Sequence, residues 1–258
     1  MPEEPTVPAT PKTKKRNERT EAKFFEDADK LIAEAERLGS EYNPPNEIAK
    51  LAGLKAGRDA ALAARVVHQA TRAEEETARN QRENLYKPLR SDVRSLVDYA
   101  KSAGKPQNEI AALNSIARQI GGGRAKAIEG GGEGSNAAGG GSHISVSHLS
   151  YASRADNYSR FIEQYASLGI ETNEDIYKAA THRAKLAALQ QANADVLAAE
   201  SASVTSGESL DKIVYTDDDS LLKGCVSAKA YIKSKYKTSG EPYKNIAKTR
   251  FDLPKRLR

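Results

Sequence analysis

The sequence of 258 residues has no tryptophan, one methionine and one cysteine. A single cysteine, Cys225, excludes a disulfide within the chain and any zinc site built from cysteines, which is compatible with a reducing compartment. No stretch approaches the roughly eighteen apolar residues of a membrane-spanning helix. The N-terminal segment also lacks the apolar core of a signal peptide. The sequence therefore predicts a cytoplasmic protein that does not enter a membrane.

Bulky apolar residues are scarce as well. Hydrophobic residues make up 38% of the chain, and the mean hydropathy is −0.66. The net charge is only +5, however, so the chain lacks the strong charge imbalance that keeps many polar sequences disordered. Much of the apolar content is alanine at helical spacing, which favours helices that approach one another closely. These features predict a folded, all-α protein.

Four helices are predicted in the first half of the chain, over residues 20–38, 46–86, 88–102 and 110–120. The first has an apolar stripe and ends at Gly39, which suits the left-handed position after a helix. The second is the longest, at about forty residues and roughly 60 Å. Asn46 is expected to cap it, after the rigid corner made by Pro44 and Pro45.

Two rows of small residues follow the long helix: Ala49, Gly53, Gly57 and Ala61 form one, and Ala52, Ala56, Ala60 and Ala64 form the other. Small residues at this spacing let another helix come close, so we expect tight packing inside a bundle; the alternative is a partner helix docked in trans. Towards its end the helix is rich in arginine and glutamate. Pairs such as Glu75 with Arg79 predict a solvated face there.

Glycine is concentrated in one segment. Residues 121–142 contain ten of the eighteen glycines and lack the fixed GxxxxGK[ST] spacing of a phosphate-binding loop, so we expect a flexible linker. The proline-rich residues 1–19 are expected to form a disordered arm. The predicted domains are this arm, a first helical repeat over 20–120, the linker, a second helical repeat over 143–251 and a basic tail over 252–258.

The second half of the chain repeats features of the first. Leu38-Gly39 recurs as Leu168-Gly169, and the alanines at 52, 56, 60 and 64 recur at 180, 184, 188 and 192. Later matches include Leu89 with Leu221 and Val93 with Cys225. The order is preserved and the offset drifts only slightly, which predicts an internal duplication. A second long helix is expected over about 173–212, with Gly207 as an early end.

A long helix with two short neighbours buries only part of its surface, so a second such unit would supply the missing partners. The predicted fold is an elongated, four-helix-bundle-like arrangement of two tandem three-helix repeats, related by a pseudo-twofold axis. Four stretches carry a resemblance: YNPPN at 42–46, RNQRENLY ending at Tyr86, SLVDYAK at 95–101 and SGEPYKNIAKTRF at 239–251. They resemble a bacterial family of uncharacterised, internally duplicated helical proteins. The resemblance implies no activity.

The sequence contains no motif typical of a catalytic site or a metal site. His68 and His182 lie on the long helices without the Glu-x-x-His or His-x-x-x-His spacing of a metal site, and are expected to be exposed or to cap helix ends. The acidic residues 217–219 precede Ser220 and are interpreted first as the start of a helix. Cys225 lies on an apolar stripe, as a small buried side chain. We therefore expect no enzyme, no cofactor, no metal and no small-molecule substrate.

The C-terminal end is strongly basic, with eleven Lys or Arg from residue 223 onward against two acidic residues. Such an end can contact nucleic acid or an acidic partner, or it can pair with the acidic residues between 195 and 219 of the same chain. Lys229, Lys233 and Lys237, spaced by four, are expected along one helix edge. The candidate contact residues are Lys229, Lys233, Lys237, Lys244, Lys248, Arg250, Lys255, Arg256 and Arg258.

The sequence thus favours a non-enzymatic helical scaffold or adaptor that binds another protein or itself. The alternative is a nucleic-acid-associated protein that uses its basic end. The salt dependence of binding distinguishes the two, because each contact to a nucleic-acid phosphate releases counterions.

Overall fold

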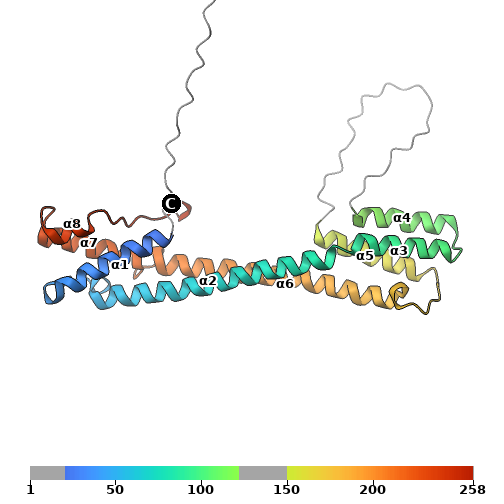
Figure 1. Ribbon diagram of the computed structural model, residues 1–258, viewed down its shortest axis with the longest axis horizontal. Helices are drawn as coiled ribbons and strands as arrows, with labels where there is room; N and C mark the ends of the chain where they lie inside the picture. The colour runs from blue at the N-terminus through green and yellow to red at the C-terminus, as the bar shows by residue number, and fades with distance from the viewer. Residues whose placement is uncertain (1–20, 122–149, 258) are drawn as a thin grey trace, which may run out of the picture. The chain divides into compact units, whose positions relative to one another are not determined.

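A computed structural model describes residues 21–121 and 150–257, which form helices joined by short turns and loops (Figure 1). No strand occurs in these two ranges, so the predicted all-α class is confirmed. The helices are α1 (Glu21–Leu38), α2 (Leu51–Tyr86), α3 (Leu89–Ser102), α4 (Gln107–Gly121), α5 (Tyr151–Ala166), α6 (Ala179–Asp211), α7 (Leu221–Tyr236) and α8 (Glu241–Ile246). The predicted arm and, apart from Gly121, the predicted linker lie outside the described residues.

The chain divides into two compact units. The first contains the described residues up to 67 and from 207 onward, and the second contains residues 68–206. Each unit therefore combines segments from both halves of the sequence. The units do not coincide with the predicted repeats, which remain a prediction about the sequence.

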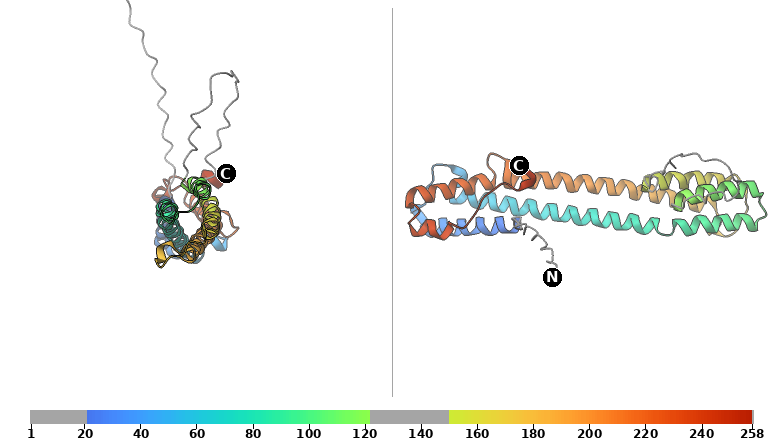
Figure 2. Two further views of the ribbon diagram at one scale, coloured as in Figure 1. Left: turned by 90° about the vertical axis from the view of Figure 1, so that its right-hand side faces the viewer. Right: turned by 90° about the horizontal axis from the view of Figure 1, so that it is seen from above.

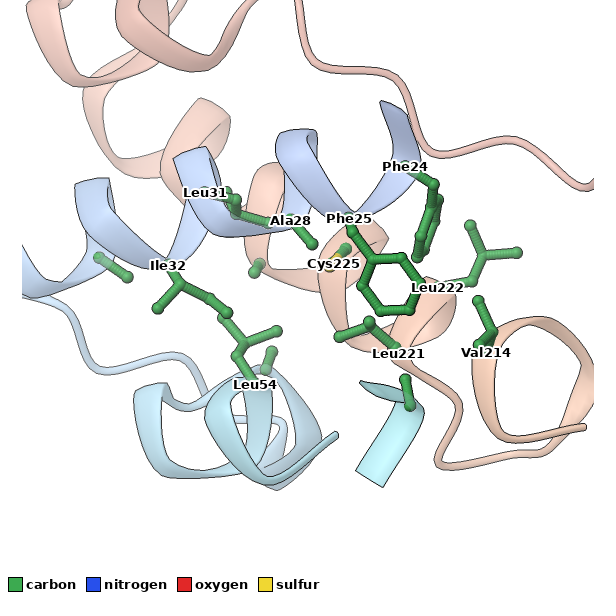
Figure 3. Packing of buried hydrophobic residues seen from close by; sticks show 14 of the residues in the cluster. Phe24, Phe25, Ala28, Leu31, Ile32, Leu54, Val214, Leu221, Leu222 and Cys225 are labelled. Carbon is green, nitrogen blue, oxygen red and sulfur yellow. The ribbon is translucent and has the colours of Figure 1, made fainter. Parts of the chain in front are cut away.

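The core of the first unit lies where α1 meets α7 and the start of α2 (Figure 3). The apolar stripe predicted for α1 is confirmed, because its members from Phe24 to Ala35 are buried. Phe24 meets Phe251 edge-to-face, with ring centroids 5.9 Å apart, so the C-terminal segment closes over α1. Cys225 is fully buried among these side chains, as its position on a stripe predicts.

The corner before α2 is held by polar contacts. The Tyr42 hydroxyl donates a hydrogen bond of 2.6 Å to the Ala49 carbonyl. The Asn46 side chain accepts from the Ile48 N–H and caps a short 3-10 turn over Glu47–Ala49. The predicted start of the long helix at Asn46 is therefore wrong by five residues: α2 begins at Leu51, because the chain first makes this separate turn.

Two glycines allow backbone segments to approach closely in this unit. A Cβ on Gly53 would overlap the Glu47 carbonyl oxygen, and a Cβ on Gly224 would lie 2.9 Å from the Ile48 carbonyl oxygen. The predicted row of small residues from Ala49 to Ala61 thus faces inward, with both alanines fully buried. This row packs against the preceding 3-10 turn and against α7.

The second long helix, α6, begins at Ala179 rather than at about residue 173 and ends close to the predicted residue 212, so the early end considered at Gly207 does not occur. α6 continues to Asp211 and then passes into a π turn over Lys212–Thr216. One glycine costs a helix only about 1 kcal/mol, which packing around Leu210 and Val214 offsets. After residues 217–219, α7 begins behind Ser220, so these acidic residues do precede a helix N-terminus.

The second unit is built from α3, α4 and α5 with the adjoining parts of α2 and α6. Figure 2 shows α4 in green beside α5 in yellow-green, and both contribute to one buried cluster. α4 is a full helix of 15 residues, longer than the 11-residue piece predicted over 110–120. It buries Ile110, Leu113 and Ile120 against its neighbours.

Between α2 and α6 the second unit has polar contacts. Arg79 bonds to Glu200 at 2.9 Å as well as to Glu75 at 2.7 Å, so the predicted Glu75–Arg79 pair is confirmed. The Ser206 hydroxyl lies 3.0 Å from His68 Nδ1 and 2.7 Å from the Thr71 hydroxyl. These three side chains satisfy one another's hydrogen-bonding groups in a region with few bulky apolar residues.

The alanine rows, by contrast, do not pack as expected. Ala52, Ala56 and Ala60 are exposed, and so are Ala180, Ala184 and Ala188. Of the matched pairs only Ala64 with Ala192 faces inward, since Ala192 is buried and Ala64 half-buried. The expectation of close helix approach along these rows is therefore wrong within the described residues.

His182 is buried, although it was expected to be exposed or to cap a helix end. Its Nε2 lies 2.8 Å from the Ile176 carbonyl, so Nε2 carries the proton and donates. Its Nδ1 then accepts the Tyr158 hydroxyl hydrogen, at 2.6 Å. Burial raises the pKa of Tyr158, which keeps this donor protonated.

Candidate interaction surfaces

Two of the nine predicted basic contact residues are engaged inside the first unit. The Lys229 ammonium donates to the carbonyls of Ala247 and Thr249, just after α8. Arg256 forms an ion pair with Asp211 at the end of α6, which raises the pKa of the guanidinium. Both side chains therefore have partners within the fold, although the Arg256 side chain stays 61% exposed.

Lys237 does not lie on the predicted helix edge. α7 ends at Tyr236, and Lys237 follows it with φ 57° and ψ 176°, a conformation that residues other than glycine rarely adopt. Lys237 therefore does not continue the helix edge that carries Lys229 and Lys233.

Four more of the predicted cations are exposed and have no carboxylate within ion-pair distance in the described ranges: Lys233, Lys244, Lys248 and Arg250. Only the backbone N–H of Arg250 is held, by Asp27 at 3.2 Å. The Lys255 side chain and Arg258 lie outside the described part. Among the acidic neighbours, Asp218 pairs with Lys223 and Asp211 with Arg256, so the pairing predicted within the chain accounts for part of the charge.

A second surface was not predicted. Along α6, one face presents Ala187, Gln190, Ala194, Leu197, Ser201 and Val204, all exposed. We call these residues the α6 face. Leu197 is 69% exposed and Val204 61% exposed, the largest apolar side chains on it. The spacing alternates between three and four residues, which is the seam of a coiled coil.

The α6 face lies beside the buried side of the same helix, roughly a third of a turn around it. Leu189, Val196 and Ser203 point inward, also at seven-residue intervals. At 100° per residue, they lie about 120–180° from Ala194 and Ser201 but only about 60–120° from Leu197 and Val204. α6 thus has apolar residues on two sides. Other described residues cover the side of Leu189 and Val196, and the side of Leu197 and Val204 is exposed.

α2 carries a thinner apolar surface at Val66 and Val67, which are 65% and 56% exposed. The sequence pattern drew attention to the alanines and glycines of this helix, and these larger side chains were missed. The signal that could have found the α6 face is the seven-residue repeat from Gln190 through Leu197 to Val204.

The described residues contain no group of three or more His, Cys, Asp or Glu side chains close enough to hold a metal ion. Cys225 is buried, and burial raises the pKa of its thiol to about 12. In the same ranges no helix is long and apolar enough to cross a membrane.

Comparisons with protein-family models, with curated proteins and with solved structures find no match for this chain.

Proposed function

We propose that the protein is a non-enzymatic helical scaffold that associates with a second copy of itself through the α6 face. The observation that carries the proposal is the exposure of Leu197 and Val204 on an unbroken coiled-coil seam. Isolated exposed apolar residues are common, but a regular row of them on one helix marks an interaction surface.

The α6 face is complementary to itself when two helices run antiparallel. A twofold axis between residues 195 and 196 sets Ala194 opposite Leu197 of the second copy. The same axis sets Ala187 opposite Val204, and Gln190 opposite Ser201. Each large side chain then meets an alanine, and the two polar residues meet each other. A contact of this kind is closed, because both copies use the same surface.

Charge supports the same register. Arg183 and Glu208 lie at the two ends of the seam, one step beyond Ala187 and Val204. In the antiparallel register each Arg183 meets Glu208 of the second copy. Arg183 already bonds to Glu163 at 2.9 and 3.0 Å, with both side chains more than half exposed, so the guanidinium has room for another carboxylate. A parallel register would instead place like charges together.

The expected dimer is weak. Burying a Leu or Val side chain fully is worth roughly 1.5–3 kcal/mol, and two from each copy are already about one third buried. The gain of about 4–8 kcal/mol is comparable with the cost of association, roughly 4–15 kcal/mol. At best about 4 kcal/mol remains, so self-association should appear only in the millimolar range of protein concentration.

Sedimentation equilibrium over that range tests the proposal. Leu197→Asn should weaken the dimer, whereas Val226→Asn, at a 47% exposed valine on α7, should leave it unchanged. Arg183→Glu alone and Glu208→Arg alone should each weaken it, and the double variant should restore it. A chain that stays monomeric throughout, or equal effects of the 197 and 226 variants, would overturn the proposal.

Spin labels determine the helix direction. Two labels at position 194 would be separated along the antiparallel axis by three residues, about 4.5 Å, in addition to the helix spacing. Two labels at position 187 would be separated by 17 residues, about 26 Å. Equal short distances at both positions would indicate a parallel pair and contradict the proposed register.

We further propose that the internal duplication is real and that the repeats exchange helices. The order of helices supports it: α1 to α4 correspond to α5 to α8, with a 3-10 turn before each long helix. Gly39 and Gly169 both have positive φ, at 55° and 58°. The first unit holds α1, α7 and α8, and the second holds the corresponding α5, α3 and α4.

Nucleic-acid association is the second candidate, favoured by the four exposed cations at 233, 244, 248 and 250 that have no carboxylate partner in the described ranges. Duplex binding should then weaken by about 0.9 log unit per tenfold salt for each phosphate contacted. Replacing Lys244 and Lys248 with glutamine should flatten that dependence. Absence of binding at physiological salt would remove this candidate without affecting self-association.

A further inference from the structure

A pocket of about 330 Å³ lies within the second unit, at the corner between α2 and α3. The end of α4 and the start of α5 complete it. Its charged lining is Lys87, Arg90 and Arg154 against Glu83, a net charge of +2. Since Glu83 pairs with Lys87 at 3.5 Å, the two arginines remain without a carboxylate in the described residues.

Aromatic rings hold Arg154 and its neighbour Arg82 in place, of which only Arg154 lines the pocket. The Arg154 guanidinium stacks over the Tyr86 ring at 5.1 Å, and the Arg82 guanidinium stacks over the Tyr151 ring at 4.1 Å. The two rings meet edge-to-face at 4.8 Å, and the Tyr86 hydroxyl donates to the Tyr151 carbonyl at 2.9 Å. A stacked guanidinium has lost most of its freedom before a ligand arrives, which favours binding.

The hydrogen-bond donors of these arginines are not all satisfied. Arg154 donates from Nη2 to the Tyr86 carbonyl at 3.2 Å, but its Nε is buried and meets no acceptor in the described residues. The Nε of Arg82, a neighbour that does not line the pocket, is buried in the same way. Because a charged donor buried without an acceptor is costly, an oxyanion close to the Arg154 guanidinium would stabilise its charge.

Arg90 packs beside Gly121, the last residue of α4. A Cβ at Gly121 would lie 3.4 Å from Cγ and Nε of Arg90, so this side chain lies against the end of α4. A shallower groove of about 590 Å³ continues along α3 past Arg90 to Arg94, with Ser91 and Ser95 on its walls. Its one carboxylate, Asp98, pairs with Lys101 at 2.7 Å.

The first turn of α5 adds a favourable dipole. Ser150 caps this 16-residue helix by accepting from the Ser153 N–H, and Tyr151, its first residue, lines the pocket. Negative charge is stabilised near a helix N-terminus. The pocket therefore combines the stacked guanidinium of Arg154, the exposed guanidinium of Arg90, the Lys87 ammonium and a helix end.

We propose that this pocket binds the phosphate group of a small phosphorylated molecule, with Arg90 and Arg154 as its guanidinium ligands. Planar guanidiniums match phosphate oxygens in pairs, and Lys87 adds a third positive charge. The half-apolar lining from Ile120 and the two tyrosines leaves space for an organic part beside the phosphate.

The test is calorimetric titration of the full chain with inorganic phosphate and with pyrophosphate at constant ionic strength. Chloride serves as the reference anion. We expect saturable binding to one site, and Arg90→Gln should raise Kd about tenfold, since one charged hydrogen bond is worth roughly 1.5 kcal/mol or more. Arg160→Gln is the matched control, because Arg160 is exposed on the same helix as Arg154 but does not line the pocket.

A variant that is expected to bind phosphate more tightly distinguishes a true binding site from a general loss of stability. Glu83→Gln removes the pocket's only carboxylate and should tighten phosphate binding several-fold. Arg90 is exposed, so its variant should retain the helical circular dichroism of the parent chain. No saturable phosphate binding, equal weakening by the variants at 90 and 160, or weaker binding after Glu83→Gln would each overturn the proposal.

Discussion

Three helical glycines of the first unit respond differently to the same substitution. Gly53 and Gly57 lie in α2 and Gly224 lies in α7, and alanine is favoured over glycine inside a helix by roughly 1 kcal/mol. At Gly57 the nearest atom to a new Cβ is Leu221 Cδ1, at 3.7 Å, an ordinary contact. Gly57→Ala should therefore stabilise the protein by up to about 1 kcal/mol.

Gly53→Ala should have the opposite effect. Its Cβ would overlap the backbone oxygen of Glu47, which cannot rotate away because it accepts the Lys50 N–H at 3.1 Å. Overpacking of this kind costs roughly 1–3 kcal/mol. After the gain of about 1 kcal/mol in helix propensity, we expect a net loss of stability of about 0–2 kcal/mol, towards the upper value because the Cβ would lie only 2.4 Å from the oxygen. Gly224→Ala, with Ile48 oxygen at 2.9 Å and Leu54 Cδ2 at 3.3 Å, should lose less, about 0–1 kcal/mol.

Urea unfolding followed by circular dichroism measures the three changes. The dependence of the unfolding free energy on urea should be the same in all variants, so that midpoints compare stabilities directly. The expected order of stability is Gly57→Ala, then the parent chain, then Gly224→Ala, then Gly53→Ala. If Gly53→Ala were as stable as Gly57→Ala, the close approach of α2 to its preceding turn would be refuted.

Three further predictions follow from the fold. Cleavage at a protease site inserted within residues 122–149 should leave the fragments together on a sizing column, because each unit contains both; their separation would contradict this. Lys237→Gly should stabilise the chain by about 1 kcal/mol in urea unfolding, since glycine tolerates that backbone conformation; an unchanged midpoint would count against the strain. Burial raises the pKa of Tyr165 and of Tyr215 to about 12, so the folded state resists their ionisation and stability should fall as pH rises from 10 to 12; absorbance at 295 nm should show a group of tyrosines that titrates near pH 12 or on unfolding, well above the usual pKa of 10.

Helix identity could be predicted because its signals are local. The stripe of α1 and the glycine after it need only the neighbouring residues to be recognised, and Gly39 does adopt positive φ. The start of α2 could not be predicted from the same signals. Asn46 is a good cap for any first turn, and the bond from Tyr42 to Ala49 and the packing of Gly224 on Ile48, which hold the separate 3-10 turn, depend on the folded structure.

Which side of a helix is buried could not be predicted from alanine. Alanine is small and favours helices whether or not it is covered, so the rows on α2 have equal local signals on both sides. The inward row is fixed by Gly53, whose missing Cβ is required by Glu47. On α6 the two seams differ in a similar way: Leu189 and Val196 are covered, and Leu197 and Val204 are exposed.

The position of charged residues in the sequence likewise does not predict which of them lie together in the structure. The eleven cations after residue 223 form the densest basic stretch, yet Lys229 and Arg256 stabilise the fold. Arg90 and Arg154 lie 64 residues apart in the sequence, where neither marks a motif, and the return of the chain at α5 brings them to one pocket. An anion binds where cations converge without carboxylates, and that depends on neighbours in space. Substitutions at 90 and 154 should therefore abolish phosphate binding more effectively than any pair from the basic C-terminal end.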